Sequence, residues 1–130
     1  MKKEKKSDKY FSLALDYYPS SGRYIHEIAS YYASHENYDK AMQVIRLFDP
    51  FIEKHRGPHN PRGIFVYKIR DLEADIRFHD GDKAKAINIA RQNLQDAKQN
   101  VYVITSSKSR NFVARDQLLE YLQKKVCLFD

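Results

Sequence analysis

The chain has 130 residues, of which 42% are hydrophobic and 31% charged, a composition that predicts one ordinary globular domain and excludes a disordered chain. No apolar run approaches the ~20 residues of a membrane-spanning helix, so no spanning segment is expected. The single cysteine, Cys127, excludes an internal disulfide, which fits the reducing cytoplasm in which we expect the protein.

The first nine residues concentrate the positive charge. The formal net charge of the chain is +6, and five lysines minus Glu4 and Asp8 place three of those charges in this segment. We therefore expect residues 1–9 to form a basic, disordered tail. No apolar segment follows it, so it does not have the pattern of a secretory signal.

Glycine and proline residues divide much of the chain into intervals of helical length, and apolar residues recur within these intervals at three-to-four spacing. The pattern predicts six helices, over residues 8–18, 23–34, 38–54, 64–79, 82–99 and 109–126. Ser20 or Ser21 is predicted to cap the second helix, and Asn37 the third. Pro50 should end or kink the third helix near Phe48, because proline interrupts the backbone hydrogen bonds of a helix.

The segment from Asn100 to Ser107 reads NVYVITSS and favours a short extended link, because β-branched and aromatic residues are weak helix formers. No longer alternating pattern occurs, so the sequence predicts an all-α protein. The last helix is expected to turn its apolar residues inward, namely Phe112, Leu118, Leu119, Leu122 and Val126.

Small and aromatic residues recur in a frame of about thirty-four residues. Small residues let two antiparallel helices approach closely, and aromatic residues fill the wedge between one helical hairpin and the next. In one uninterrupted frame these positions, with a terminating proline, are Phe11, Ala14, Pro19, Ala29, Tyr32, Tyr38, Ala41 and Ile45. Downstream, the segment GDKAKA from Gly81 to Ala86 repeats the inter-helix turn, with Ala86 in the place of Ala41.

This pattern resembles the tetratricopeptide repeat over about residues 10–99. The resemblance implies antiparallel helical hairpins stacked as a short right-handed superhelix, beginning with half a repeat. Residues 100–130 are then a link and a C-terminal capping helix. The implied function is a non-enzymatic scaffold or adaptor that binds a partner protein or peptide in a concave groove, or associates with itself.

The resemblance also implies which side chains meet a partner, because the first helix of each hairpin lines the groove. The expected groove residues are Arg23, His26, Glu27, Ser30, Lys68, Asp71 and Asp75, with Ala33 and Phe78 beside them. The helix over residues 8–18 has no partner on its upstream side. Its apolar residues Phe11, Leu15 and Tyr18 are therefore predicted to dock on a second copy, another protein or further repeats of a longer chain.

An alternative is a small basic helical protein that binds RNA or DNA, since basic residues interleaved with aromatic ones can contact phosphates and stack on bases. The candidate contacts are Lys54, Arg56, Arg62 and Arg70, with Lys68 and Tyr67 among them. A second basic cluster comprises Lys108, Arg110 and Arg115. A third possibility is a helical accessory domain of a larger enzyme.

The sequence offers no enzyme or metal motif as a candidate site. The chain has no Gly-rich phosphate loop and no nucleophile elbow. His55 and His59 are separated by a Gly-Pro pair, so they do not share a helical face, and no ligands with zinc spacing lie nearby. We expect no catalytic residue, no metal site and no cofactor.

Overall fold

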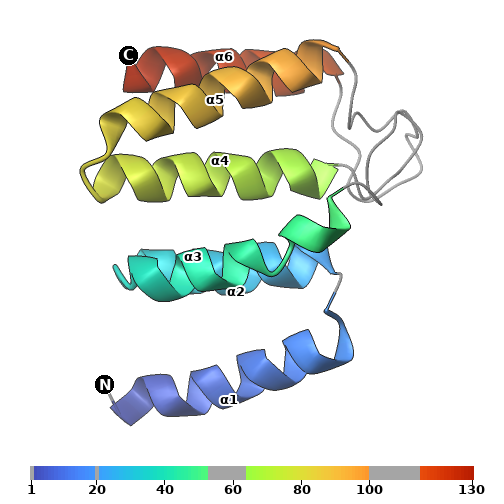
Figure 1. The fold of residues 1–130 in the computed structure, drawn as a ribbon, viewed down its shortest axis with the longest axis vertical. Helices are drawn as coiled ribbons and strands as arrows, with labels where there is room; N and C mark the ends of the chain where they lie inside the picture. Colours follow the sequence, from blue (N-terminus) through green and yellow to red (C-terminus); the bar gives the residue numbers. More distant parts are fainter. Residues whose placement is uncertain (1, 20, 53–63, 100–114) are drawn as a thin grey trace.

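The computed structural model describes residues 2–19, 21–52, 64–99 and 115–130 (Figure 1). Within these residues the protein is all-helical and contains no strand. The helices are α1 (Lys2–Tyr17), α2 (Gly22–Ser34), α3 (Tyr38–Arg46), the short 3-10 helix η1 (Asp49–Phe51), α4 (Ile64–His79), α5 (Lys83–Lys98) and α6 (Arg115–Phe129).

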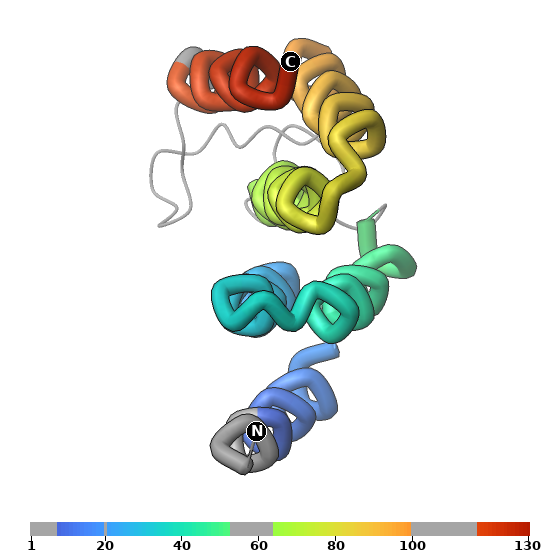
Figure 2. Tube along the Cα trace, turned by 90° about the vertical axis from the view of Figure 1, so that its left-hand side faces the viewer, coloured from blue at the N-terminus to red at the C-terminus, as the bar shows by residue number. Residues whose placement is uncertain are grey.

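The helices lie one above another in a stack, with α1 at one end and α5 and α6 at the other (Figure 1). α2 packs against α3, α4 against α5, and α6 against α5, while α4 also contacts α2. Viewed from the side, α2, α4 and α6 lie along one flank of the stack, and α3 and α5 lie along the other (Figure 2). The flank formed by α2, α4 and α6 carries the candidate site.

Boundaries of α1, α3 and α6 differ from the sequence prediction. α1 begins at Lys2 rather than near Asp8, so the segment predicted to be a disordered tail is helical from its second residue. Lysine and glutamate are good helix formers, and extending an existing helix adds one hydrogen bond per residue fixed. α6 runs from Arg115 to Phe129, three residues beyond its predicted end. The predicted link over residues 100–107 and Phe112 lie outside the described residues.

Other boundaries follow the sequence closely. The hydroxyl of Ser21 caps α2 by accepting a hydrogen bond from the Tyr24 N–H. α4 has the predicted bounds, and α3 ends at Arg46, ahead of the proline at position 50. Pro50 is the second residue of the single turn η1, so the helix predicted over residues 38–54 is an α-helix only as far as Arg46.

The alanines expected between paired helices are buried. Ala29 on α2, Ala41 on α3 and Ala86 on α5 all have 0% exposed surface. Ala29 and Ala41 belong to one core cluster that also takes in α4 and the start of α6. At the N-terminus of α2, a Cβ atom on Gly22 would lie 2.7 Å from the Cβ of Phe65 on α4. Small residues therefore set how closely the helices approach.

The turn between α2 and α3 has the same construction as the turn between α4 and α5. In each turn one residue adopts a positive φ: Glu36 at 60° and Gly81 at 94°. The next residue caps the following helix, since Asn37 accepts a hydrogen bond from the Lys40 N–H and Asp82 accepts one from the Lys85 N–H. The two turns are therefore built alike, at Glu36 and Asn37 in one and at Gly81 and Asp82 in the other.

Within the described part of the chain, no helix combines the length and apolar character needed to cross a membrane.

The two turn residues provide a paired test. Glu36 carries a side chain in a conformation that favours glycine, so Glu36→Gly should raise the free energy of unfolding by about 0.5–1 kcal/mol. Gly81→Ala should lower it by about 1 kcal/mol, and the cause is conformational because a Cβ there meets no atom within 4 Å. Urea unfolding of both variants checks the signs; a loss of stability in Glu36→Gly would contradict the turn geometry.

Candidate functional site

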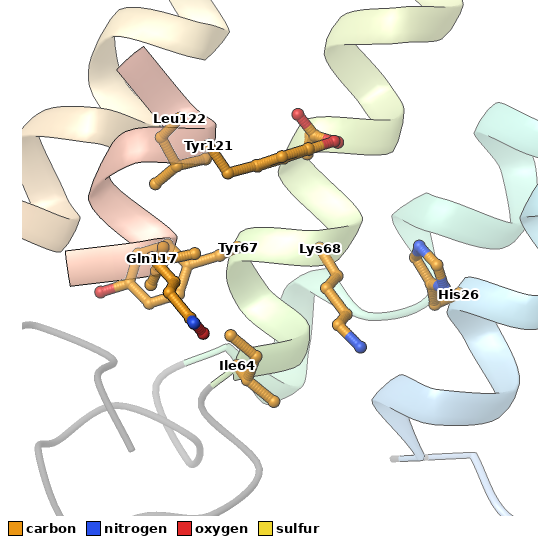
Figure 3. A pocket seen from close by; sticks show the side chains of 9 residues that line it. His26, Ile64, Tyr67, Lys68, Gln117, Tyr121 and Leu122 are labelled. Carbon is orange, nitrogen blue, oxygen red and sulfur yellow. The ribbon is translucent and has the colours of Figure 1, made fainter. Parts of the chain in front are cut away.

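A groove of about 400 Å³ lies between α2, α4 and α6 (Figure 3). Its walls come from three helices on one flank of the stack, which are separated in the sequence by α3 and α5. The lining residues are His26 from α2, then Ile64, Tyr67, Lys68 and Asp71 from α4, and Gln117, Leu118, Tyr121 and Leu122 from α6.

The floor of the groove is apolar. Ile64, Tyr67 and Leu122 are each at most 2% exposed, and Leu118 is 7% exposed. Ile64 and Tyr67 are three residues apart on α4, and Leu118 and Leu122 are four apart on α6. Each pair therefore lies on one side of its helix, and both helices turn an apolar stripe toward the same space. The floor can therefore receive apolar groups, while the polar side chains lie around its edge.

One edge of the groove carries a positive charge. Burial lowers the pKa of His26, and the nearby charge of Lys68 lowers it further, so the imidazole is neutral at neutral pH. The Lys68 ammonium lies 5.4 Å from the centre of the Phe65 ring. No described carboxylate lies within ion-pair distance of Lys68, so its charge remains available at the edge of the groove.

The opposite edge carries a cluster of charged and polar groups that joins α6 to α4. The Tyr121 hydroxyl donates a hydrogen bond of 2.6 Å to Asp71, and the Lys125 ammonium donates one of 2.8 Å to Asp75. Lys125 also lies 3.6 Å from Asp71, and its side chain is only 13% exposed. These contacts hold α6 over α4 and so fix the width of the groove.

The pKa values in this cluster follow from its burial. Burial raises the pKa of Asp71, although the hydrogen bond from Tyr121 and the charge of Lys125 act against the rise. Burial and the hydrogen bond to Asp71 together raise the pKa of Tyr121 to about 12, so it remains a donor. Burial lowers the pKa of Lys125, but Asp75 and Asp71 outweigh that effect and the pKa rises.

The structure brings three of the predicted groove residues together and separates the others from them. His26, Lys68 and Asp71 line the groove. Arg23 and Glu27 are exposed and pair with each other at 3.4 Å along α2. The remaining predicted residues do not line it: Ser30 is half-buried, Asp75 is bonded to Lys125, Ala33 lines a different hollow, and the Phe78 ring stacks on Phe129 at 4.7 Å.

Sequence reasoning missed the contribution of α6, because residues 100–130 lie outside the repeat frame. Gln117, Leu118, Tyr121 and Leu122 form one wall of the groove. The burial of Leu118 and Leu122 confirms the inward orientation that was predicted for them. Their apolar spacing was the one feature of the sequence that pointed to this face of α6. The role of Tyr121 and Lys125 as partners of Asp71 had no signal in the sequence.

Two of the predicted docking residues of α1 pack partly against the rest of the protein. Phe11 and Leu15 are half-buried: both pack against the core, and the Phe11 ring meets Tyr31 and Tyr32 edge-on at 5.0 and 5.6 Å. Phe11 and Leu15 lie about one helical turn apart, so the face they share is the one that α1 buries against α2. Tyr18, at 56%, is exposed as expected.

α1 is also held by a carboxylate. Asp8 accepts hydrogen bonds from the Tyr32 hydroxyl on α2 and the Lys40 ammonium on α3. The hydrogen bond from Lys40, supported by the one from Tyr32, holds the pKa of Asp8 below its ordinary value. The first helix is therefore attached to the α2–α3 hairpin by both aromatic packing and an ion pair.

The predicted nucleic-acid contacts fall largely outside the described residues. This holds for Lys54, Arg56 and Arg62, and also for Lys108 and Arg110 of the second cluster. Arg70 is described, and its guanidinium is bonded to Asp96 on α5. Among the residues the structure describes, no three histidine, cysteine, aspartate or glutamate side chains gather in a way that could hold a metal ion.

Comparison with protein-family models, with characterised proteins and with solved structures gives no match to this chain.

The attachment of α6 to α4 can be tested at Lys125. Lys125→Met leaves Asp71 and Asp75 without their cation in a partly buried site, and should lower the free energy of unfolding by about 2–3 kcal/mol. Lys124→Met is the matched control, because Lys124 is 75% exposed and pairs only with Glu120 one turn away. It should change stability by less than about 0.5 kcal/mol. Equal effects in chemical denaturation would contradict the role of Lys125.

The attachment of α1 predicts a pH dependence. Because the native pKa of Asp8 lies below its ordinary value of 3.8, its contribution to stability is present above that pH and is lost as the pH falls through the native pKa. Asp8→Asn should therefore cost about 1 kcal/mol near pH 7 and progressively less in acid. Burial raises the pKa of Asp71, so this group changes the free energy of unfolding with pH in the opposite direction over the same range. The measured quantity is therefore the difference in unfolding free energy between wild type and variant, in which the contribution of Asp71 cancels. Asp80→Asn, at an exposed site, is the control and should change the free energy of unfolding near pH 7 by less than about 0.5 kcal/mol.

Proposed function

We propose that this chain is a non-enzymatic protein-interaction module of the tetratricopeptide-like type, which holds a peptide or helix of a partner protein in the groove between α2, α4 and α6. The observation that carries the proposal is the groove itself: an apolar floor with polar groups at its edges, formed by the alternate helices of the stack. Its volume lies in the ordinary range of binding sites.

The stacked hairpins support the tetratricopeptide-like part of the proposal. Buried alanines occupy the helix pairs, and the two inter-helix turns share their capping and their positive φ. The spacing from Ala41 to Ala86 is 45 residues, longer than the repeat of about 34 because residues 53–63 intervene. In a stack of this kind, alternate helices line the concave surface that binds partners.

The groove chemistry supports a peptide ligand over a reaction. A peptide side chain can bury apolar surface against Ile64 and Leu122, which stabilises the complex without any chemistry. Lys68 and Gln117 then offer donors to backbone carbonyls at the edge, which fixes the orientation of the segment. The strongest cluster of charged groups, around Asp71, is already engaged in holding α6.

The alternative function, binding of RNA or DNA, rests on the basic residues of the sequence. Of its described candidate contacts, Arg70 is bonded to Asp96, which favours the protein-interaction proposal, and Lys68 lies at the edge of the groove. Titration of labelled single-stranded and duplex nucleic acid at two salt concentrations separates the two functions. Binding that falls steeply with salt supports the alternative, and no binding at low salt dismisses it.

The proposed groove can be tested with two matched substitutions. Peptides that bind the wild-type chain are first selected from a random library. Their affinities for wild type, Gln117→Trp and Asn88→Trp are then measured by fluorescence polarisation. Both positions are exposed, but only Gln117 lines the groove. Gln117→Trp should weaken the selected peptides at least about tenfold, or 1.4 kcal/mol, while Asn88→Trp should leave them unchanged.

Thermal unfolding of both tryptophan variants serves as the control for folding. Peptides that bind both variants as tightly as wild type would place their site elsewhere, and failure to select any peptide would reject the groove as a peptide site.

A further inference from the structure

The outer face of α1 carries a stripe of exposed apolar side chains. Tyr10, Leu13 and Tyr17 are 65%, 47% and 77% exposed. They are three and four residues apart, so they lie on one side of the helix. The half-buried residues Phe11 and Leu15 lie on the side that packs against the rest of the protein. Because α1 is at the end of the stack (Figures 1 and 2), the other described helices lie on one side of it, and the exposure of these three side chains means that those helices do not cover the stripe.

A contiguous stripe of this kind differs from scattered exposed apolar residues. Single exposed leucines are common on protein surfaces, whereas apolar side chains that adjoin one another mark interaction sites. Tyrosine is enriched in protein interfaces, since its ring buries apolar area and its hydroxyl remains polar. Among the described residues, neither Tyr10 nor Tyr17 has a hydrogen-bond or ring partner, so both rings are available to another molecule.

Two opposite charges lie along the edge of the stripe. Lys9 and Asp16 are exposed and seven residues apart, which places them on the same edge of α1, two turns from each other. Leu13 lies nearly midway between them. Within the described residues, no salt bridge engages either charge. The stripe is therefore flanked by a cation toward its N-terminal end and an anion toward its C-terminal end.

We propose that two copies of this chain associate through antiparallel pairing of their α1 helices. A twofold axis that relates two antiparallel helices brings the same edge of each helix together with its direction reversed. Lys9 of one copy then lies opposite Asp16 of the other, and the symmetry repeats this pair. Leu13 packs against Leu13 of the other copy at the centre, and the tyrosine rings cover it on both sides.

The charge pattern selects this occupant and this orientation. In a parallel pair of helices opposite edges meet, so Lys9 and Asp16 would not face each other. In the antiparallel pair, Lys9 of each copy meets Asp16 of the other, so the two identical surfaces neutralise each other. A twofold interface requires this self-complementarity. The contact spans two helical turns, so we expect a small interface and a dimer with micromolar or weaker affinity.

This inference goes beyond the proposed peptide-binding function and is independent of it. The groove is formed by α2, α4 and α6, and α1 contributes no side chain to its lining. A dimer through α1 therefore leaves the groove of each copy open. Loss of dimerisation with peptide binding intact, or the reverse, identifies which proposal fails.

The test is sedimentation equilibrium of the full chain over a concentration range that spans the micromolar region. Wild type should form a dimer whose fraction rises with concentration. Lys9→Asp and Asp16→Lys each place like charges opposite one another, and each should weaken the dimer about tenfold, a loss of 1.4 kcal/mol. An equimolar mixture of the two variants should form a mixed dimer, because every charge again meets its opposite.

Two further variants complete the test. The double variant Lys9→Asp, Asp16→Lys should restore the wild-type dimer, and Lys85→Asp, the same charge change on α5, should leave the dimer unaffected. Circular dichroism checks that each variant remains helical. A monomer at every concentration overturns the inference. So do single variants that dimerise as wild type, or a mixture that gains nothing, since both place the contact on another surface or in another orientation.

Discussion

Close approach of helices at small residues is the constraint on which the stack depends. Ala29 and Ala41 are fully buried on the paired helices α2 and α3, and Gly22 places the start of α2 where a Cβ would collide with Phe65 of α4. A larger side chain at any of these positions would separate two helices and open the core between them. Large side chains such as Tyr67 then fill the remaining space, so the spacing of the stack is set by small residues and maintained by large ones.

The groove depends on a second interaction, because α6 does not belong to either hairpin. Leu118 and Leu122 bury its apolar face, but apolar packing alone is non-directional. The hydrogen bond from Tyr121 to Asp71 and the ion pair of Lys125 give α6 a fixed position over α4. The same groups close one edge of the groove, so the interactions that complete the fold also determine the shape of the candidate site.

Much of the fold could be predicted because its signals are local. Apolar periodicity predicted the helices, and Ser21 and Asn37 marked helix starts through capping, which involves residues only three apart. The buried positions of Ala29 and Ala41 followed from the repeat frame. The site was predicted in part, because His26, Lys68 and Asp71 do line the groove, whereas the wall from α6 depends on contacts between residues about 50 positions apart. Periodicity also failed to orient α1, since apolar residues occupy both of its faces, and only packing decides that Phe11 turns inward and Tyr10 outward.

The two faces of α1 explain how one short helix can serve two roles. Its inner face is held by the Phe11 ring and by Asp8, which bonds to both α2 and α3. This attachment uses residues of the inner face and leaves Tyr10 and Tyr17 exposed. A surface helix needs only one apolar stripe to pack against its own core, so a second stripe adds nothing to the stability of a single copy. The contacts of the inner face hold the outer stripe in one orientation, which would lower the entropy lost in the proposed pairing with a second α1.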